Sequence, residues 1–578
     1  MIALQLVLLL YSVSLCGGFL HSNSALTKAR NSYSFITTPA RSSSSSTFIA
    51  STSTNKNPDV IVIGSGIGGL CAANILRHVH KKTVLVLESH YLPGGCAHTF
   101  PIKGYEFESG PTILLGCSKP PLNPLRQVLD ICGLNVDWIS YSSWGVLGDG
   151  DEQWDLELGR DASNRPKFDS IIEERSHSPA LAKTEFAQLL EKTLPLIVPA
   201  TEIPAMALRA DSKVLFTLLA KHTKSLFKLL QLPDAGTGPF DPYMNGPIHT
   251  VTDPWLRSWL DGLAFSLSGL EAARTPASAM SYVLWDLHRD NGSLDYPKGG
   301  MKSLVNALVS GLGDDEIRLK STVASIDIVG NRACGVTLKN GEKLVSNEGV
   351  ICNAPLWCLR DLLKPAESDS GNGGVKTLLD EIRSVNMTRS YLHLHVGLDA
   401  EGIDQSKLKP HYTVWEKGMV GDSEHVCSEL NMIAVSNVCN FDDSLEVPEG
   451  KIMMHAYACG NEEYGIWEDL SKEEYEALKK ERAETLWSAI EKVVPDARER
   501  CEVEMIGSPL THERFLRRPR GTYGAEVESL FQDGSTSVDG LVLCGDGIFP
   551  GIGLPSVALS GVSAANSFVG VWKQLQNY

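Results

Sequence analysis

The pattern of apolar and polar positions is clearest between residues 60 and 88. The run Val60–Ile63 is continuously apolar and β-branched, as in a strand buried on both faces, and residues 83–87 repeat this pattern. Between the two runs lie a glycine-rich turn and a segment that favours a helix. The pattern therefore predicts a strand, a turn, a helix and a second strand, the unit that builds parallel α/β sheets.

The turn carries a dinucleotide-binding pattern formed by Gly64, Gly66 and Gly69. Gly64 permits the tight turn, Gly66 lets the backbone approach a pyrophosphate, and Gly69 lets the helix pack against the strand. The helix N-terminus favours the negative charge of the phosphates. Glu88 ends the second strand, where a carboxylate can accept hydrogen bonds from a ribose, which argues against a 2′-phosphate. A glycine turn that binds nothing is the alternative, and it leaves this combination of features unexplained.

Downstream of this unit, helical and strand patterns alternate along the chain. Helices are predicted at residues 123–133, 185–199, 301–312 and 470–494. Strands are predicted within 141–176, at 317–319, 323–329, 332–338, 343–345 and 349–352, and within 391–460. Because helices and strands are interleaved in this way, we expect an α/β fold with additional sheet contributed by the middle of the chain.

Residues 208–232 carry a basic amphipathic pattern in an otherwise acidic chain. Apolar residues recur there at helical spacing, and Asp211 is the only acid among them. The cations of the segment are Arg209, Lys213, Lys221, Lys224 and Lys228. A basic amphipathic helix can lie in a membrane interface. A core helix with a solvated lysine face fits the same pattern, so both interpretations stay open.

The N-terminal residues have the composition of targeting segments. Residues 1–18 form an apolar stretch of signal-peptide length that ends in small residues. Residues 19–58 begin with Phe, are rich in Ser and Thr, and contain four basic residues but no acid. A signal peptide followed by such a transit segment resembles the bipartite plastid presequence of algae with complex red-lineage plastids. A secretory signal and a linker are the alternative.

Cysteine usage and net charge limit the compartments and the classes of partner that fit this chain. The 13 cysteines include no CxxC pair, and several lie in apolar runs, which is typical of buried free thiols in a reducing compartment. The formal charge of −17 becomes about −21 without the presequence, which disfavours a nucleic-acid partner. Beyond the N-terminus no apolar run reaches the roughly 18 residues that cross a bilayer, so we predict no spanning helix in the mature chain.

Further motifs complete a recognisable set. They are Pro93-Gly94-Gly95, residues 104–111 (GYEFESGP), 508–515 (SPLTHERF), 520–524 (RGTYG) and 541–555 (LVLCGDGIFPGIGLP). With the glycine turn, they resemble the carotenoid isomerase branch of the phytoene desaturase and FAD-dependent amine oxidase superfamily over residues 60–569. The resemblance implies an α/β fold in which a Rossmann-type FAD-binding domain is assembled from discontinuous segments around an inserted α+β substrate domain. We expect the first domain at 59–140, 296–360 and 501–578, and the second at 141–295 and 361–500.

The resemblance also implies that the cofactor is FAD, bound non-covalently. The positions that match the contacts of the family are Gly64, Gly66, Gly69, Glu88, Gly94, Gly95, Val323, Gly545, Asp546 and Gly551. Val323 is carried over as a backbone contact to the adenine. One position departs from the pattern, because Cys96 stands where many relatives have arginine after the two glycines. No metal site is predicted.

The expected substrate is a carotenoid delivered from a plastid membrane, with which the protein makes peripheral contact, from the stroma or at the thylakoid or envelope. A reduced flavin can act on a polyene without net redox change, which gives cis–trans isomerisation or hydration of a xanthophyll, as in a step towards fucoxanthin-type pigments. A desaturase or retinol-saturase-like oxidoreductase and a non-catalytic FAD- and carotenoid-binding protein are the alternatives. His512, Glu513 and Asp546 are the candidate proton donors, and each of them can equally be structural.

Overall fold

The computed structural model describes residues 57–110, 112–148, 152–232, 238–367, 373–526, 529–531 and 533–578. The predicted signal peptide at 1–18 and nearly all of the predicted transit segment at 19–58 lie outside the described residues. No helix among the described residues is long and apolar enough to cross a membrane.

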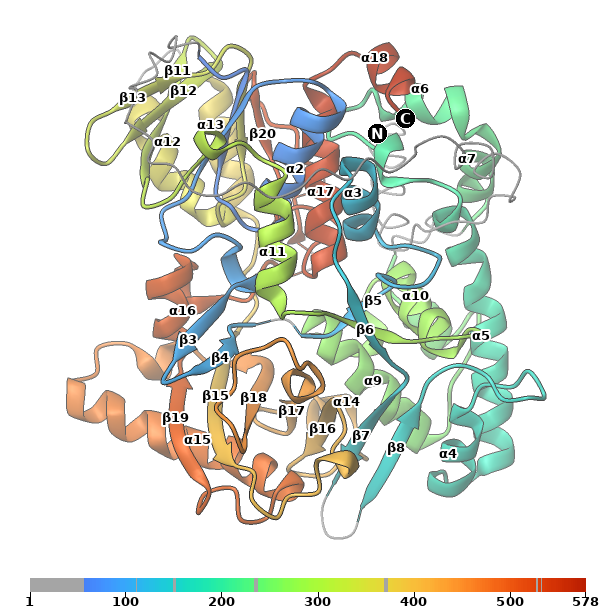
Figure 1. Cartoon of the computed structure of the whole chain (residues 1–578). Coiled ribbons are helices and arrows are strands. Elements are labelled where there is room, and N and C mark those ends of the chain that lie inside the picture. Colours follow the sequence, from blue (N-terminus) through green and yellow to red (C-terminus); the bar gives the residue numbers. More distant parts are fainter. Residues whose placement is uncertain are drawn as a thin grey trace, which may run out of the picture.

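A five-stranded parallel sheet forms the nucleotide-binding half of the molecule (Figure 1). Its strands, in spatial order, are β10 (Ile317–Arg318), β2 (Val84–Leu87), β1 (Val60–Ile63), β14 (Gly349–Cys352) and β20 (Leu541–Leu543). All four strand pairs are parallel. The three central strands are apolar and fully buried, as the sequence pattern predicts. The prediction of an α/β fold with a Rossmann-type sheet assembled from distant segments is confirmed.

Two helices cross closely on this sheet. They are α2 (Ile67–Asn74), which continues in a π-helical turn over Ile75–Val79, and α17 (Leu554–Ser567). A side-chain carbon at Gly561 would lie only 2.2 Å from the carbonyl oxygen of Gly68, so the backbones touch. Next to them pack α3 (Pro124–Cys132), capped by Asn123 and ended by Gly133, and α11 (Met301–Ser310). Both agree with the predicted helices to within about two residues.

A seven-stranded sheet forms the second half of the molecule. Its strands, in spatial order, are β19 (Cys501–Gly507), β15 (Ser390–Asp399), β18 (Lys451–Glu462), β17 (Met432–Ser436), β16 (His411–Trp415), β7 (Ser143–Leu147) and β8 (Gln153–Glu157). One face packs on α15 (Lys472–Val493), which Ser471 and Glu474 cap reciprocally. The predicted sheet within 391–460 is confirmed, and its neighbours come from distant parts of the chain.

Two sequence-based boundaries are wrong. Residues 501–507 were expected in the FAD-binding domain, but β19 pairs antiparallel with β15 as the edge strand of the seven-stranded sheet. The expected sheet within 141–176 ends at β8, because residues 168–175 form helix α4. Phe168 and Ile172, four residues apart, are the buried face of α4, which is a helical spacing and not a strand alternation.

Further strands and helices complete the fold. The strands are β3 (Thr99–Ile102), β4 (Tyr105–Glu108), β5 (Leu114–Leu115), β6 (Trp138–Tyr141), β9 (Leu294–Pro297), β11 (Val323–Val329), β12 (Arg332–Leu338) and β13 (Lys343–Val345). The helices are α5 (Pro179–Thr201), α8 (Asp241–Met244), α9 (Pro254–Ser268), α10 (Ala277–His288), α12 (Leu359–Glu367), α13 (Gly373–Arg383), α14 (Ser423–Val426), α16 (Pro509–Leu516) and α18 (Val571–Gln576). Asn340 and Gly341 form the predicted hairpin turn.

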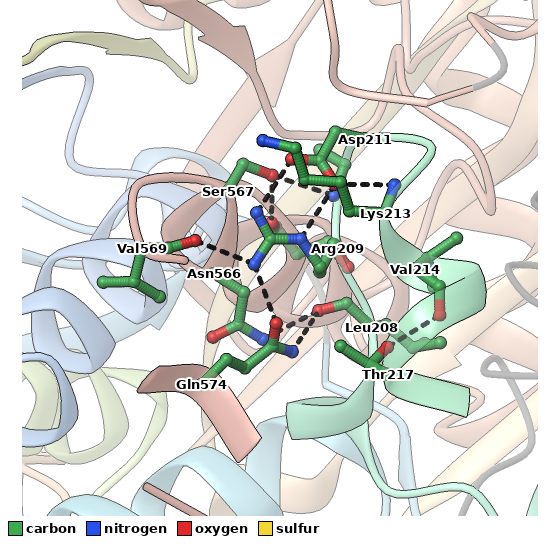
Figure 2. Close-up of polar contacts among 12 residues, drawn as sticks. Leu208, Arg209, Asp211, Lys213, Val214, Thr217, Asn566, Ser567, Val569 and Gln574 are labelled. Carbon is green, nitrogen blue, oxygen red and sulfur yellow. Dashed lines mark hydrogen bonds and ion pairs between the residues drawn. The ribbon is translucent and has the colours of Figure 1, made fainter. Parts of the chain in front are cut away.

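The basic segment 208–232 is not one helix. It forms α6 (Val214–Lys221) and α7 (Thr223–Leu230), with non-helical backbone at His222. Arg209 precedes both helices and is fully buried, so it does not belong to an exposed basic face. Figure 2 shows its guanidinium donating to Asp211 at 2.8 Å and to the Gln574 side chain at 2.8 Å. A buried charge needs such partners, and these contacts fasten the start of α6 to α18.

Glu108 joins the hairpin β3–β4 to strand β9 and to the start of α11. Its buried carboxylate accepts hydrogen bonds from the Tyr296 hydroxyl at 2.6 Å, the Met301 backbone N–H at 2.9 Å and the Thr99 hydroxyl at 2.8 Å. Burial raises the pKa of this carboxyl group to about 7, against an ordinary value of 4.5. The group therefore holds its proton in the folded protein at pH values where it loses it in the unfolded chain.

Replacing Glu108 by Gln should remove a pH dependence of stability. The stabilisation from proton uptake by Glu108 is complete below pH 4.5 and is lost as the pH rises through about 7. Gln resembles the protonated carboxyl group and keeps its acceptor at Tyr296. The free energy of unfolding of Glu108→Gln, relative to the unsubstituted protein, should rise by about 3 kcal/mol between acidic and alkaline pH. Urea titrations of both proteins near pH 5 and pH 8 measure this change. If the two proteins differed in their free energy of unfolding by the same amount at both pH values, the prediction would be wrong.

Candidate functional site

The glycine turn between β1 and α2 has the geometry that a dinucleotide needs. Gly64 adopts φ 92°, which only glycine takes without strain. A side-chain carbon at Gly69 would lie 2.2 Å from the carbonyl oxygen of Gly64, so the helix lies directly on the strand end. Gly66 caps α2 without a side-chain hydrogen bond, and no acid lies in the first turn of the helix. The N–H groups of this helix start can therefore face a pyrophosphate.

The second glycine pair lies on the first turn. Gly94 takes φ 107°, and its N–H donates to the carbonyl oxygen of Ser65 at 3.0 Å. A side-chain carbon at Gly95 would lie 3.2 Å from the Cα atom of Gly66. Residues 94–95, predicted as cofactor contacts, thus form a wall directly beside the turn at residues 64–69.

Glu88 lies at the carboxyl end of β2, where a ribose is expected. The Glu88 carboxylate accepts hydrogen bonds from the backbone N–H of Ser65 at 2.9 Å, from the Ser65 hydroxyl at 2.7 Å, and from the His90 N–H at 2.7 Å. The carbonyl oxygen of Glu88 accepts from the Ser321 N–H at 2.7 Å. Val323, two residues further on, is buried at the start of β11. The structure therefore places the predicted ribose and adenine contacts at the same edge of the sheet, while their contact with FAD stays a prediction.

The C-terminal motif forms the opposite wall. Gly545 and Gly551 take φ angles of 110° and 106°, and the Gly545 N–H donates to the Ser560 hydroxyl at 2.9 Å. Gly553 begins α17 without a capping side chain, and no acid lies in the first turn. Asp546 follows Gly545 in the loop between β20 and α17. This second uncapped helix start fits a cofactor that lies between the two glycine loops.

Asn353 holds the two loops together, and the sequence analysis did not identify it. A side-chain carbon at Gly66 would lie 2.9 Å from its Nδ2 atom, one at Gly68 would lie 2.6 Å from its Oδ1 atom, and one at Gly545 would lie 3.2 Å from Oδ1. The Cys544 thiol lies 3.4 Å from the same oxygen. Asn353 directly follows the buried strand β14, and this position at the end of a parallel strand is the signal that could have revealed it.

Arg518 is a second residue that sequence reasoning missed. It is buried and forms an ion pair with the Asp546 carboxylate. Its Nη1 atom lies 3.8 Å from the Cys96 thiol, next to the second glycine pair. The family resemblance leads us to expect an arginine after the two glycines, where this chain has Cys96. The Arg518 guanidinium lies beside that position although it comes from a distant part of the chain. Because Asp546 balances its charge, the guanidinium mainly fixes Asp546 and the Tyr523 backbone beside the cofactor loops.

The three candidate proton donors separate in the structure. Asp546 is paired with Arg518. Glu513 accepts hydrogen bonds from the Tyr464 hydroxyl at 2.6 Å and from the Arg520 N–H at 3.3 Å, so both of its carboxylate oxygens have partners. The ring of His512 lies 4.8 Å, centroid to centroid, from the ring of His393 on β15. These placements favour His512 over Glu513 as a group that can reach a substrate, and no substrate contact is established for any of them.

His393 belongs to a histidine cluster on the seven-stranded sheet. His393 and His395 on β15 and His455 on β18 point to the face opposite α15, because the intervening leucines fill the face towards α15. His393 Nδ1 and His455 Nε2 lie 2.8 Å apart, within hydrogen-bond distance. His395 Nε2 lies 2.9 Å from the carbonyl oxygen of Glu108 and can donate to it. Histidines at alternate positions of a strand pattern are the sequence signal for this cluster.

All four imidazoles of this group are held neutral. Burial lowers the pKa of His395 and of His512 to about 4. Burial, together with the neighbouring imidazoles and His512, lowers the pKa of His393 and of His455 well below the ordinary value of 6.5. A neutral imidazole carries one N–H donor and one acceptor nitrogen, so each ring can both donate and accept a hydrogen bond. The lowered pKa makes the imidazolium form a stronger acid once it takes up a proton.

Tyrosine rings extend the cluster into a polar and aromatic wall. The ring of Tyr457 on β18 lies 5.0 Å from His455, and the ring of Tyr391 lies 4.6 Å from Tyr523 in an edge-on arrangement. The backbone carbonyl of Tyr523 accepts a hydrogen bond from Arg518 at 2.6 Å. The wall therefore runs without a break from the cofactor loops to the histidines. Flat aromatic surface beside proton-carrying groups suits an extended unsaturated substrate.

Replacing Gly66 by Ala should weaken FAD binding. The added methyl group would lie 2.9 Å from Asn353 Nδ2 and would hinder the approach of the cofactor to the backbone. We expect a loss of at least tenfold in affinity, or about 1.4 kcal/mol, read from flavin absorbance and from the thermal shift on FAD addition. Gly373→Ala is the matched control, because no neighbouring atom lies within 4 Å of an added carbon. Equal FAD binding by both variants would contradict the assignment of the turn.

Known proteins are similar to this chain over most of its length. The chain is 28% identical to the chloroplastic prolycopene isomerase of Arabidopsis thaliana over 520 residues, which cover 88% of this chain and 82% of that protein. It is 26% identical to the human all-trans-retinol 13,14-reductase over 512 residues, covering 81% of this chain and 77% of the reductase. The resemblance to the carotenoid isomerase branch is thereby confirmed.

Solved structures show the same fold. An oxidoreductase from Methanosarcina mazei superposes with a TM-score of 0.56 at 17% identity, covering 87% of this chain and 99% of that one. A variant of putrescine oxidase superposes with a TM-score of 0.55 at 16% identity, covering 88% and 97%. At this level of identity the likeness concerns the fold alone.

A family profile matches nearly the whole described chain. The profile for flavin containing amine oxidoreductases covers residues 67–567, from the first helix of the glycine turn to the end of α17. This match agrees with the two uncapped helix starts and the glycine loops, and it supports FAD as the cofactor. The chain belongs to the flavin-containing amine oxidoreductase family.

Proposed function

We propose that this protein is a plastid FAD-dependent enzyme that acts on a carotenoid or xanthophyll polyene without net redox change. The observation that carries the proposal is the similarity to a prolycopene isomerase over 88% of the chain. The change is cis–trans isomerisation, or hydration of an unsaturated bond in the biosynthesis of a fucoxanthin-type xanthophyll. The names of the relatives and the composition of residues 1–58 support a plastid location, in the stroma or on a membrane surface.

The chain's own residues suit such a reaction. The glycine loops would hold FAD at Gly66, Gly95 and Gly545, and the ion pair of Arg518 with Asp546 would lie beside it. Bound in its reduced form, the flavin supplies electrons that a polyene can take up and give back. The histidine and tyrosine wall provides proton carriers and flat aromatic surface, and the buried setting excludes bulk water from a reactive intermediate.

An oxidoreductase with net redox change is the second candidate. The observation in its favour is the similarity to the human all-trans-retinol 13,14-reductase, which covers 81% of this chain. Such an enzyme would change the number of hydrogens in the polyene and would need an external electron donor or acceptor. A protein that binds FAD and carotenoid without turnover is a third candidate.

Product mass and flavin redox state distinguish these candidates. The protein from residue 59 onwards is incubated without oxygen with plastid carotenoids in liposomes, with FAD oxidised or reduced beforehand. We expect a product of unchanged mass, or heavier by one water, that forms only with reduced flavin and without its stoichiometric reoxidation. A product two hydrogens lighter or heavier, with matching flavin turnover, would replace this proposal by the oxidoreductase. Bound pigment without any product would favour the binding protein.

We further propose that α6 and α7 dock on an anionic lipid bilayer, from which the substrate would enter. Large apolar side chains are exposed at Phe216 and Leu219 of α6 and at Phe227 and Leu230 of α7, with exposed fractions of 65, 51, 58 and 48%. Within each helix the two residues are three positions apart and so share a face. Lys213 and Lys224 lie one turn before them, and neither has an ion pair among the described residues. An apolar row with cations at its edge suits an anionic membrane surface.

The surroundings of these helices support a fixed docking surface. Arg209 and Ala210 fasten the start of α6 to α17 and α18 (Figure 2), and Ala210 N–H donates to the Ser567 hydroxyl at 3.0 Å. Trp572 of α18 is 73% exposed, and α18 packs against α6. The docking helices are therefore attached to α17, the helix that begins at the cofactor loop.

Vesicle binding tests this surface. Phe216→Ser with Phe227→Ser should lower co-sedimentation with phosphatidylglycerol-containing vesicles at least tenfold, because two apolar anchors are lost. Lys213→Glu with Lys224→Glu should abolish the preference for anionic over neutral vesicles. The matched control is Val329→Ser with Val345→Ser, which removes side chains that are 70% and 51% exposed on the sheet β11–β13. Unchanged binding by the phenylalanine variant would contradict the proposal.

A further inference from the structure

The histidine cluster has buried nitrogen atoms without partners. His393 Nε2, His395 Nδ1 and His455 Nδ1 are inaccessible to solvent and form no hydrogen bond, while each histidine as a whole is 5% exposed. An unsatisfied buried polar group costs roughly 1–3 kcal/mol. Several such groups at one place indicate a site that is completed by something else, such as a water molecule or a substrate. Because His393 Nδ1 and His455 Nε2 contact each other at 2.8 Å, the unpartnered nitrogens of these two rings lie on the outer sides of the pair.

We infer that the hydrogen-bonded pair His393–His455 is the proton-transfer group for the polyene. This inference rests on the proposed function and names the residues that carry its proton step. His393 is the member of the pair nearest to His512, which in turn adjoins Arg518 and the cofactor loops. A proton given by one imidazole can be replaced from the other through the contact of 2.8 Å between Nδ1 and Nε2.

The proton balance closes for both reactions. The cycle begins when the pair has taken up one proton and is an imidazolium. In hydration an N–H bond of this imidazolium breaks, its electron pair stays on the nitrogen, and a C–H bond forms at one carbon of the unsaturated bond. The water oxygen then bonds to the neighbouring carbon, and the released water proton returns to the imidazole pair. In isomerisation the same protonation leaves a single bond that can rotate, and the carbon afterwards returns a proton to the pair. Neither reaction involves a net oxidation or reduction, and only hydration changes the composition of the substrate.

Ring geometry favours this role over metal binding. The ligand atoms of His393, His395 and His455 lie within 4.8 Å of one another, which is close enough for a metal ion. A metal must lie near the plane of each imidazole that binds it, along the lone pair of the nitrogen. The rings of His395 and His455 are stacked, with centroids 4.0 Å apart and planes inclined by 10°. Nearly parallel planes at this separation cannot share one metal ion, whereas His393 and His455 already share a hydrogen bond.

Solvent deuterium tests the role of the pair. His393→Gln and His455→Gln are compared with His411→Gln, which removes a buried histidine from β16 of the same sheet, outside the cluster. In heavy water, product of the unsubstituted protein should carry carbon-bound deuterium. Turnover should fall about 100-fold or more in the two cluster variants and should persist in His411→Gln. FAD content and carotenoid absorbance of each variant show that the binding sites are intact.

A second measurement does not depend on activity. In the protein labelled with ¹⁵N-histidine, the shared imidazole proton should give an NMR signal that exchanges slowly with solvent. The signal should vanish in both cluster variants and remain in His411→Gln. Turnover of the cluster variants equal to that of the control, or a product without carbon-bound deuterium, would overturn the inference. One equivalent of tightly bound metal in the purified protein would overturn it in favour of a metal site. Absence of any product from the unsubstituted protein would instead remove the proposed function itself.

Discussion

The structure depends on a close approach of backbones around Asn353. Turns after β1 and β20 reach its side chain only because Gly66, Gly68 and Gly545 have no side-chain carbon. Asp546 follows Gly545 and pairs with Arg518, and Arg518 leads to the histidine and tyrosine wall. One set of contacts thus holds the predicted cofactor loops and the histidine and tyrosine wall in fixed positions relative to each other.

The nucleotide-binding unit could be predicted because its signals are local. Residues 60–88 contain a strand, turn, helix and strand within a short segment, and each glycine has a steric task that nearby backbone defines. Apolar periodicity also located α3, α11 and α15. The N-caps of α3 and α15, Asn123 and Ser471, directly precede these helices, so they are local signals as well. Predictions of this kind need no knowledge of how distant segments pair.

The remaining features depend on long-range packing. His393 and His455 meet only because β15 and β18 pair in one register, with His395 opposite His455. The break at His222 is hidden in the sequence, since the apolar spacing continues across it from α6 into α7. Residues 501–507 alternate like any edge strand, and only pairing with β15 assigns them to the seven-stranded sheet. Buried Arg209 looked like one more surface cation because its partner Gln574 lies far along the chain.

The contact between Arg518 and Cys96 shows that a guanidinium can reach one place in the fold from a different position in the sequence. The family resemblance implies an arginine after the glycine pair, where this chain has Cys96, and the Arg518 guanidinium lies 3.8 Å from the Cys96 thiol. Restoring arginine at position 96 would place two cations against each other in a buried setting, which is unfavourable without a second anion. An arginine at position 96 therefore calls for a change at Arg518 as well. If a motif were transplanted into this chain one residue at a time, the variant with both arginines would be less stable than the chain before or after the full exchange.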